Sequence, residues 1–309
     1  MRIPSGEQYE IAHGDQRVVV TEVGAGLRSY EAGGRDVLDG YDADEMASSG
    51  RGQVLIPWPN RIAGGRYEWR GRSLQLPLTE PEGGNAIHGL VRWSAWRVVE
   101  QEPHRLVLGH GVHPQPGYPF ALDLRVEYAL SEDGLRVETT ATNVGAEPCP
   151  YGAGAHPYLA PGTPTVDTAT LRLPARSVLE TDAAGIPVGR TAVEGTPFDF
   201  RDPLPVGDTA LDHCFTDLDR DADGRARVTL GDPGSGRAVA LWVDERYPYL
   251  MLYTGDARPD VARRSLAVEP MTCPPNAFSS GESVIELAPG TSAAGSWGLS
   301  PGRSPTPSA

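Results

Sequence analysis

Lysine is absent from this chain of 309 residues, so all 27 of its basic residues are arginine. Without lysine there can be no Schiff base between a protein amine and a carbonyl substrate, and no lysine to anchor pyridoxal phosphate. A phosphate-binding loop of the Gly-x-x-x-x-Gly-Lys-Ser/Thr type is excluded for the same reason. Any catalysis must therefore rest on other side chains.

Cysteine is also scarce. Cys149, Cys214 and Cys273 lie far apart and form no Cys-x-x-Cys pair, so neither a disulfide framework nor a zinc ribbon is predicted. Residues 1–10 are polar and lack the apolar segment of a secretory signal. No run of residues approaches the ~18 apolar positions of a membrane span. These absences predict a cytoplasmic protein that does not insert into membranes.

Positive charge is in deficit, because 41 acidic residues outnumber 27 basic ones and give a net charge of −14. A field of this sign repels nucleic acids and anionic membrane surfaces, so neither is expected as a partner. The chain does contain 37 glycines and 29 prolines, dispersed along its length. This composition favours many short strands joined by turns over long helices.

Period-two alternation is the dominant pattern. Every second residue of 122–130 is apolar, turn residues follow at 131–134, and 135–141 alternates again, which predicts an antiparallel hairpin. Further strands are predicted at 67–76, 96–100, 105–109, 226–230, 239–243, 249–253, 265–269 and 283–287. We find no internal repeat and no long amphipathic helix, and 261–264 could hold one helical turn at most. The sequence predicts an all-β chain folded as one large antiparallel β-sandwich over residues 1–299.

Two polar segments need separate interpretation. Residues 217–224 carry aspartate at every second position, as a calcium-binding loop would, but the glutamate expected at the twelfth position of such a loop is missing. A solvated turn is therefore the preferred interpretation. Residues 300–309 are rich in serine and proline and are predicted to be a disordered tail.

Polar residues interrupt apolar or turn-forming sequence at five places, each at an expected strand end, where functional side chains are commonly found. They are Asn60-Arg61, His88, His156, Asp212-His213 and Glu269. Each one alone has an ordinary structural explanation, such as a hydrogen-bonded core histidine or an arginine in an ion pair. Together they could form an acid–base site with partners for sugar hydroxyls. His213 is left out, because in a strand it would point away from the face that carries Asp212.

The same positions lie within a series of short motifs. In chain order these are Trp58-Pro-Asn-Arg-Ile62 with Gly65-Arg-Tyr67, Asn85-Ala-Ile-His-Gly89, Gly117-Tyr-Pro-Phe120, Asn143 with Gly154-Ala-His-Pro-Tyr158, Leu211-Asp-His-Cys-Phe215 and Val268-Glu-Pro-Met-Thr272. The series resembles the aldose 1-epimerase (galactose mutarotase) family, with Phe120 where that family usually has glycine. The motifs span most of the chain, and their shared order makes the resemblance specific.

The resemblance implies a supersandwich of the galactose mutarotase type and the interconversion of the α and β anomers of a free aldose, without a metal or other cofactor. It assigns His156 as the acid at the ring oxygen and Glu269 as the base at the C1 hydroxyl. The residue types agree with these roles, because imidazole titrates near neutrality and partial burial raises the pKa of a carboxyl group. The only expected partner is a small sugar, bound by a monomer or a homodimer.

The other matched positions would contact the substrate. The residues expected to hold sugar hydroxyls are Asn60, Arg61, His88 and Asp212. Trp58 and Tyr158 either stack on the apolar face of the sugar or are ordinary core aromatics, and the sequence leaves both alternatives open.

Three other functions stay open at this point. A metal enzyme could use His88, His156, His213, Asp212 and Glu269, although no closely spaced histidine pair is present. An epimerase of hexose 6-phosphates would need an arginine cluster, for which Arg263-Arg264 and Arg70 with Arg72 are candidates. A carbohydrate-binding protein without catalysis would need neither an acid nor a base.

Overall fold

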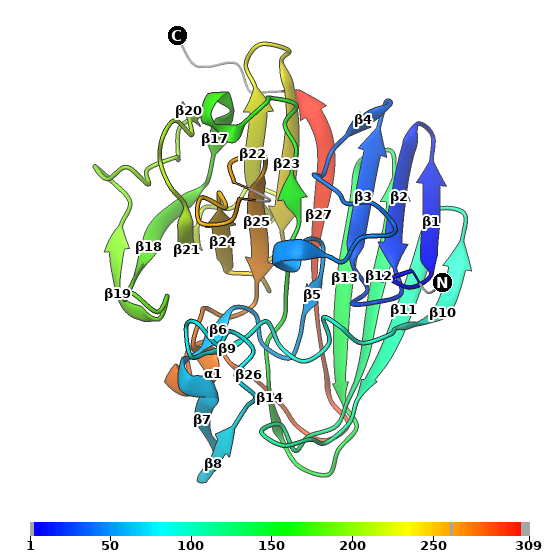
Figure 1. Cartoon of the computed structure of the whole chain (residues 1–309), viewed down its shortest axis with the longest axis vertical. Helices are drawn as coiled ribbons and strands as arrows, with labels where there is room; N and C mark the ends of the chain where they lie inside the picture. The colour runs from blue at the N-terminus through cyan, green and yellow to red at the C-terminus, as the bar shows by residue number, and fades with distance from the viewer. Residues whose placement is uncertain (1–2, 260–261, 304–309) are drawn as a thin grey trace.

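The computed structural model describes residues 3–259 and 262–303, and strands make up nearly all of the regular structure in this range (Figure 1). The strands form three large sheets and three short pairs, and neighbouring strands run antiparallel. The all-β antiparallel class predicted from the sequence is confirmed. No helix in the described part of the chain is long and apolar enough to cross a membrane.

The N-terminal sheet has four strands in the order β1-β2-β3-β4. Their bounds are β1 (Gln8–His13), β2 (Gln16–Thr21), β3 (Leu27–Ala32) and β4 (Arg35–Asp36). The nine-stranded sheet has the order β10-β11-β12-β13-β27-β23-β22-β17-β20. Its strands are β10 (Arg97–Glu102), β11 (Arg105–Val112), β12 (Leu122–Ser131), β13 (Gly134–Asn143), β17 (Thr170–Arg172), β20 (Leu204–Pro205), β22 (Ala226–Asp232), β23 (Arg237–Val243) and β27 (Ser292–Arg303). The N-terminal sheet packs through β1 against β11 and β12.

The eight-stranded sheet has the order β19-β18-β21-β24-β25-β15-β5, with β16 also paired to β25. Its strands are β5 (Val54–Leu55), β15 (Gly154–Ala155), β16 (Tyr158–Leu159), β18 (Ala175–Thr181), β19 (Pro187–Ala192), β21 (Asp212–Leu218), β24 (Tyr249–Tyr253) and β25 (Leu266–Met271). All six residues of β25 are buried, so this strand is a central element of the molecule.

Short elements complete the fold. The three strand pairs are β6 (Arg61–Ile62) with β9 (Ala86–Ile87), β7 (Arg66–Trp69) with β8 (Arg72–Gln75), and β14 (Cys149–Tyr151) with β26 (Ile285–Leu287). Within the described residues the helical segments are α1 (Ala277–Ser280) and the 3-10 turns η1 (Ser48–Gly50), η2 (Ala63–Gly65) and η3 (Val166–Thr168).

The predicted hairpin is present as β12 and β13, which pair from Leu122 with Asn143 to Ser131 with Gly134. Burial alternates along β12 as the sequence alternates, with one face in the core. The segment 67–76, expected as one strand, is instead a tight hairpin. Arg70 and Gly71 both have positive φ, which reverses the chain between β7 and β8.

The predicted tail needs correction at its start. Strand β27 continues to Arg303, and residues 300–303 pair with β23, so they are part of the nine-stranded sheet. Pairing with a neighbouring strand outweighs the local serine and proline content, while 304–309 lie outside the described residues. The possible helical turn at 261–264 lies partly outside them as well, and 262–264 form a turn.

The acidic segment 217–224 ends β21 and then forms an exposed turn before β22. The carboxylates of Asp221 and Asp223 both pair with the guanidinium of Arg227. These ion pairs agree with a solvated turn, because the carboxylates are occupied by an arginine at the start of β22.

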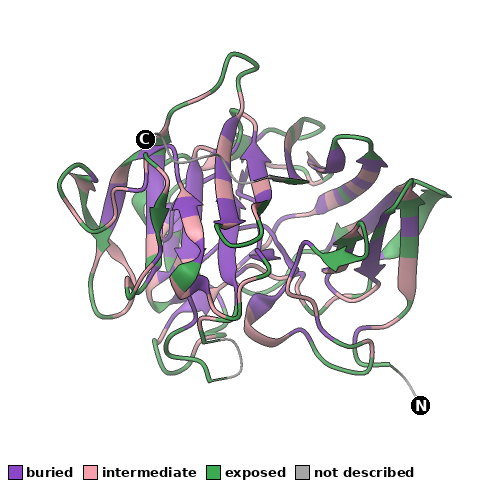
Figure 2. Ribbon diagram, turned by 90° about the horizontal axis from the view of Figure 1, so that it is seen from above, coloured by how far each residue is buried: buried purple, intermediate pink, exposed green. Residues whose placement is uncertain are grey.

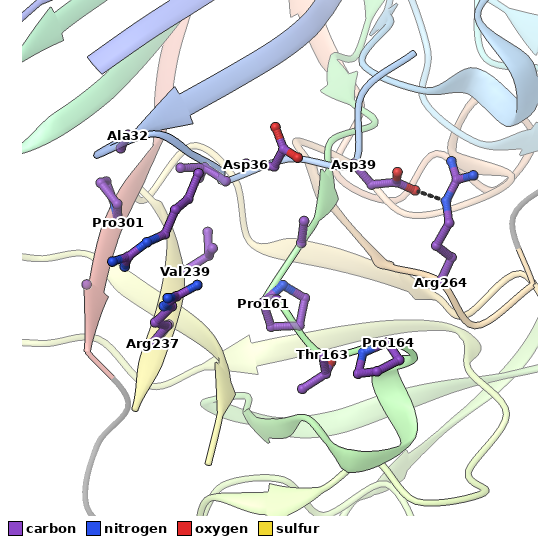
Figure 3. Close-up of a pocket in the computed structure, with 16 residues that line it drawn as sticks. Ala32, Asp36, Asp39, Pro161, Thr163, Pro164, Arg237, Val239, Arg264 and Pro301 are labelled. Carbon is purple, nitrogen blue, oxygen red and sulfur yellow. Dashed lines mark hydrogen bonds and ion pairs between the residues drawn. The ribbon is translucent and has the colours of Figure 1, made fainter. Parts of the chain in front are cut away.

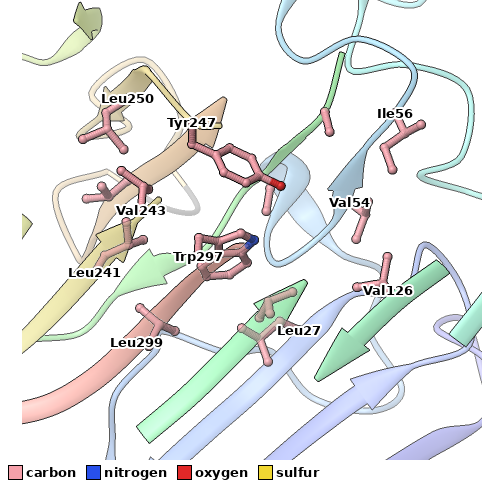
Figure 4. Packing of buried hydrophobic residues seen from close by; sticks show 14 of the residues in the cluster. Leu27, Val54, Ile56, Val126, Leu241, Val243, Tyr247, Leu250, Trp297 and Leu299 are labelled. Carbon is pink, nitrogen blue, oxygen red and sulfur yellow. The ribbon is translucent and has the colours of Figure 1, made fainter. Parts of the chain in front are cut away.

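One hydrophobic core joins the large sheets. Figure 4 shows side chains from the N-terminal sheet (Leu27), the nine-stranded sheet (Leu241, Trp297) and the eight-stranded sheet (Val54, Leu250) packed together. Buried residues occupy the centres of the large sheets, and exposed residues gather in outer strands and loops (Figure 2). This core packs against one face of the eight-stranded sheet. The polar motif residues lie on the opposite face.

Candidate active site

The two faces of the eight-stranded sheet differ in their surroundings. Leu250, Leu252 and Val268 belong to the main core. Met251 and Met271 belong to a second, smaller cluster on the other face. Because strand side chains alternate between faces, Glu269 shares the face of Met271 and pairs directly across from Met251.

The same alternation places the aspartate and histidine of β21. Asp212 shares the parity of Cys214, which lies in the smaller cluster, so Asp212 is on the face of Glu269. His213 shares the parity of Phe215 in the main core, and its ring lies 4.3 Å from the ring of Phe198. His213 therefore points away from Asp212, as the sequence analysis expected.

A cavity of about 320 Å³ opens on this face. Six of the predicted site residues line it: Asn60, Arg61, His88, His156, Asp212 and Glu269. Asn60, Arg61 and His88 lie in or beside the β6–β9 pair, whereas His156, Asp212 and Glu269 lie in or beside β15, β21 and β25 of the eight-stranded sheet. Residues as distant in sequence as Asn60 and Glu269 are thereby brought around one cavity.

His156 and Glu269 are in direct contact at the base of the cavity. Nε2 of His156 lies 3.3 Å from Oε1 of Glu269, and the two residues are 4% and 2% exposed. Among the described residues, Nδ1 of His156 and Oε2 of Glu269 have no hydrogen-bond partner. Each group thus keeps hydrogen-bonding capacity that the protein itself does not satisfy.

Burial opposes charge on both groups of this pair. Desolvation, with the positive charges of Arg92 and Arg51, lowers the pKa of His156 from 6.5 to about 3. Desolvation and the Asp212 carboxylate raise the pKa of Glu269 well above 4.5, against the opposing effect of Arg61. Burial therefore favours the neutral form of the pair, with a proton on the Glu269 carboxyl group beside a neutral His156.

His88 and Asn60 hold each other in place. The backbone N–H of Asn60 donates to Nδ1 of His88 at 3.2 Å, and the backbone N–H of His88 donates to the Asn60 carbonyl at 2.9 Å. Both residues have positive φ, at 53° and 61°, so each lies at a sharp bend of the chain. The first hydrogen bond leaves the proton of a neutral His88 on Nε2, where it can be donated to a ligand.

Arg61 is fixed by the carboxylate of Glu80, which no sequence motif marks. Its Nε and Nη2 donate to Glu80 at 2.9–3.1 Å, and Asn85 donates to the same carboxylate at 3.0 Å. This fork-shaped contact orients the guanidinium along the cavity wall. Glu80 lies in a turn rich in proline and glycine, where no periodicity marks a functional position.

Two aromatic predictions are corrected by the structure. Trp58 is 1% exposed and packs against Phe278 in the core, so it does not line the cavity. Tyr158 is also absent from the cavity wall, and its ring stacks on His156 with centroids 5.0 Å apart. In both cases apolar flanking sequence reflects burial, which removes the ring from reach of a sugar.

Other residues that the motifs did not reveal do line the cavity. Arg92 and Trp93 follow His88 in the chain, and the Arg92 guanidinium lies 5.8 Å from the centre of the Trp93 ring. Trp93 is 52% exposed, which is unusual for so large an apolar side chain. Met251 and Tyr253 add wall surface from β24. Loop residues such as Arg92 carry no pattern that separates them from surface charge.

The arginine clusters considered for phosphate binding lie elsewhere. Arg70 and Arg72 pair with surface glutamates, and Arg263 pairs with Asp167 and Asp256. Neither these residues nor Arg264 line the cavity that holds His156 and Glu269. The clusters therefore act within the fold and are not arranged around the candidate site.

A metal is a poor match to the hydrogen bonds of the site. His88, His156 and Glu269 place potential ligand atoms within 4.8 Å of one another, and two histidines with a glutamate is a known zinc ligand set. A metal-bound imidazole normally donates its second ring N–H to an acceptor. Here Nδ1 of His88 faces a backbone donor, and Nδ1 of His156 has no partner among the described residues. We therefore derive no step through a metal.

A second cavity, of about 440 Å³, lies between the N-terminal sheet and the ends of β23 and β27 (Figure 3). Its wall includes the ion pair of Asp39 and Arg264, together with Pro161 and Arg237. None of the motif residues of the first cavity line it. Although this cavity has the larger volume of the two, it lacks those residues and is not the candidate active site.

Sequence comparisons match nearly the whole chain to one protein family. The family model described as aldose 1-epimerase matches residues 7–299. Uncharacterized protein YihR of Escherichia coli (strain K12) is 36% identical over 287 residues, covering 93% of this chain and 90% of the relative. Galactose mutarotase of Sus scrofa is 27% identical over 284 residues, covering 82% and 80%.

Solved structures share the fold. The GalM/aldose epimerase homologue from C. elegans gives a TM-score of 0.85 at 20% identity and covers 96% of this chain and 99% of its own. Galactose 1-epimerase from Lactobacillus acidophilus NCFM gives a TM-score of 0.80 at 21% identity, with coverage of 96% and 95%. At these identities the likeness establishes the architecture alone.

Proposed function

The chain belongs to the aldose 1-epimerase family, and from this premise we propose that it is a mutarotase that interconverts the α and β anomers of a free aldose. The observation that carries the proposal is the buried contact of His156 with Glu269 at the base of a cavity with polar walls. This pair can give one proton and take another, and anomer interconversion requires those two transfers.

The proposed ring opening moves two protons, and it starts from the tautomer of the pair in which the Glu269 proton has passed across the 3.3 Å contact to Nε2 of His156. His156 then donates this proton from Nε2 to the ring oxygen O5 as the C1–O5 bond breaks, and the bond electrons pass to O5. Glu269 as carboxylate accepts the proton of the C1 hydroxyl, and the O–H electrons form the C1=O bond. The open-chain aldehyde then turns about the C1–C2 bond, and the reverse transfers close the ring on the other face.

The His156–Glu269 pair returns to its starting protonation state at the end of the cycle. Ring opening converts a charged His156–Glu269 pair into a neutral one, and reclosure returns it to the charged form. The neutral form is the one favoured by the burial of both groups, so it matches the state in which the open aldehyde is held. No proton needs to enter or leave the site during the cycle.

The remaining wall residues would bind hydroxyl groups. Arg61, His88 and Asn60 can donate hydrogen bonds, and Asp212 can accept them. Holding the ring fixed while C1 reacts contributes much of the rate in reactions of this kind. We propose these four residues as substrate-binding, with Trp93 in place of Trp58 as the aromatic surface.

Polarimetry on freshly dissolved α-anomers tests the proposal. A panel of free D-glucose, D-galactose, D-xylose and L-arabinose, with D-glucose 6-phosphate beside it, would be followed with and without the protein. We expect the same final rotation to be reached faster with at least one free aldose. Acceleration of the phosphate ester alone would instead support an epimerase of hexose phosphates, and no acceleration with any sugar would contradict the proposal.

A further inference from the structure

His156 is held by residues 49–53, which are the end of η1 and the chain that follows it. The His156 carbonyl accepts from the backbone N–H of Gly52 at 2.8 Å, and its own N–H donates to the Gln53 carbonyl at 3.2 Å. Gly50 lies so close that a Cβ there would be 2.7 Å from Cδ2 of His156. The hydroxyl of Tyr158 donates to the carbonyl of Ser49 at 3.1 Å. The segment therefore fixes both the catalytic histidine and the tyrosine stacked on it.

Arg51 extends this arrangement with a third planar group. Its Cζ lies 5.0 Å from the centre of the Tyr158 ring, and the Tyr158 and His156 rings are nearly parallel, with an angle of 13° between them. A guanidinium over an aromatic face is attracted to it electrostatically. Movement of Arg51 would therefore disturb the tyrosine ring and, through it, the orientation of His156.

The guanidinium of Arg51 is buried with few hydrogen-bond partners and one long ion pair. Arg51 is 4% exposed, and among the described residues its Nε and Nη2 have no hydrogen-bond partner. Its ion pair with Asp39 is 3.4 Å long. Asp39 accepts shorter contacts from Arg264 at 2.9 Å (Figure 3) and from Ser265 at 2.7 Å. Burying a cation so weakly satisfied is costly to the fold, which points to a role beyond stability.

The charge of Arg51 acts on His156. The groups that face the His156 ring are Glu269 from β25, His88 and Arg92 from the loop after β9, Tyr158 from β16 and Arg51. Among these, Arg92 and Arg51 are fixed positive charges, and both disfavour a second positive charge on the imidazole. Arg51 differs from Arg92 in lying outside the cavity wall, so it can act only through His156 and Tyr158.

We propose that Arg51 is a positioning residue of the epimerase reaction, which aligns the His156 ring through Tyr158 and whose charge favours release of the proton from His156 to the ring oxygen. The inference rests on the proposed function for its kinetic consequences. Arg51 touches neither the cavity nor the sugar in this account, and a role in substrate affinity is not expected.

The test compares Arg51→Met with Arg264→Met. Both remove an arginine that contacts Asp39, but Arg264 is half exposed and has no contact with Tyr158 among the described interactions. We expect Arg51→Met to lower kcat about tenfold or more with little change in KM, because the acid is misaligned. Arg264→Met should keep wild-type kcat and KM. Wild-type kinetics in a folded Arg51→Met protein, or equal losses in both variants, would overturn the proposal.

Charge and alignment are separated by Arg51→Lys. A lysine keeps the positive charge but cannot reproduce the planar stack. The acid limb of the profile of kcat against pH is the range in which kcat falls as His156 gains a proton. Arg51→Met loses the charge and should move this limb to higher pH. Arg51→Lys should keep the limb near its wild-type position, with a reduced kcat. An acid limb that stays in place in Arg51→Met would remove the electrostatic part of the proposal.

Two further measurements keep the proposal testable. The first applies if Arg51→Met does not fold. Tyr158→Leu loses the stacked ring and should lower kcat, whereas Tyr158→Phe keeps the ring and should retain most of the activity. Full activity in Tyr158→Leu would overturn the proposed alignment of His156.

The second measurement, NMR titration of the His156 ring protons, needs no substrate. If the protein is inactive on every sugar but the His156 pKa rises in Arg51→Met, the interaction of Arg51 with His156 is upheld and the proposed function is rejected. If the His156 pKa does not change, the interaction itself is rejected.

Discussion

Nε2 of His156 and Oε1 of Glu269 are 3.3 Å apart, and both side chains are almost completely buried. An imidazole and a carboxyl group in such contact share their protons, and they titrate as a pair. Burial makes the neutral form of the pair the favoured one, with the proton on the carboxyl group. The predictions below follow from this relationship and from the side chains that surround it.

The pH dependence of turnover should be displaced from that of a free histidine. The active pair holds one proton, so activity is lost in acid only when a second proton binds His156, whose pKa is lowered to about 3. Activity is lost in alkali when the shared proton leaves, at the raised pKa of Glu269. We expect no loss of kcat as pH falls through about 6.5, where a free imidazole titrates. A drop in kcat centred there would contradict the neutral pair.

Stability must be followed in the same pH series. His88 and His156 are buried with lowered pKa values, so below pH 6.5 these two positions bind more protons in the unfolded chain than in the folded one. The contribution of these two residues to the free energy of unfolding is therefore present above pH 6.5 and is lost progressively as pH falls. Thermal unfolding at each pH separates a loss of folded protein from a change in kcat.

Arg61 and Glu80 should act together in substrate binding. Arg61→Met removes the guanidinium from the cavity wall, and we expect KM to rise about tenfold with a smaller change in kcat. Glu80→Gln leaves Arg61 present but loosens its orientation, so its KM should rise by less. Arg72→Met is a matched control, because Arg72 has a similar ion pair with Glu147 at the surface. A change in kcat alone in Arg61→Met would assign Arg61 a different role.

Trp93 should provide the aromatic surface for the sugar. Trp93→Ala removes an exposed ring at the cavity, and KM is expected to rise about fivefold while kcat is retained. Trp58→Phe provides the comparison, because Trp58 lies in the core and its substitution should lower the melting temperature without raising KM. The opposite pattern would restore Trp58 as the substrate contact.

Gly50 should be required for the position of His156. Its φ is +74°, and an added Cβ would lie 2.7 Å from Cδ2 of His156. Gly50→Ala should therefore lower kcat as well as stability. Gly14→Ala introduces similar backbone strain at φ +59°, but a Cβ there meets nothing within 4 Å. It should cost about 1 kcal/mol of stability and leave kcat intact, and equal kinetic losses in both variants would contradict the close contact.

Much of the fold follows from alternation in the sequence. Strands such as β12 and β13 are half-buried, so their apolar and polar residues alternate and their pairing could be predicted. Strand β2 buries four consecutive residues at its end, and β27 contains serine, glycine and proline, so neither shows a simple alternation. Their positions depend on neighbours in the sheets, which a local pattern does not contain.

The site was predictable where motifs mark it. His156 and Glu269 are 113 residues apart, and family motifs, not any local pattern, placed them together. Glu80, Arg92 and Arg51 lie in turns and loops whose sequences resemble ordinary surface segments. Trp58 and Tyr158 were ambiguous for a physical reason, because an apolar neighbourhood is expected both for a sugar-stacking ring and for a core ring.

The central claim is that His156 and Glu269 exchange protons with the anomeric centre. It is tested most directly by exchange NMR between the anomeric protons of the α and β forms of a substrate aldose at equilibrium, with wild type, Glu269→Gln and His156→Asn. We expect enhanced exchange with wild type and a loss of about a hundredfold or more in each variant, with circular dichroism showing that the fold is retained. Exchange at the wild-type rate in either folded variant would contradict the role of that residue.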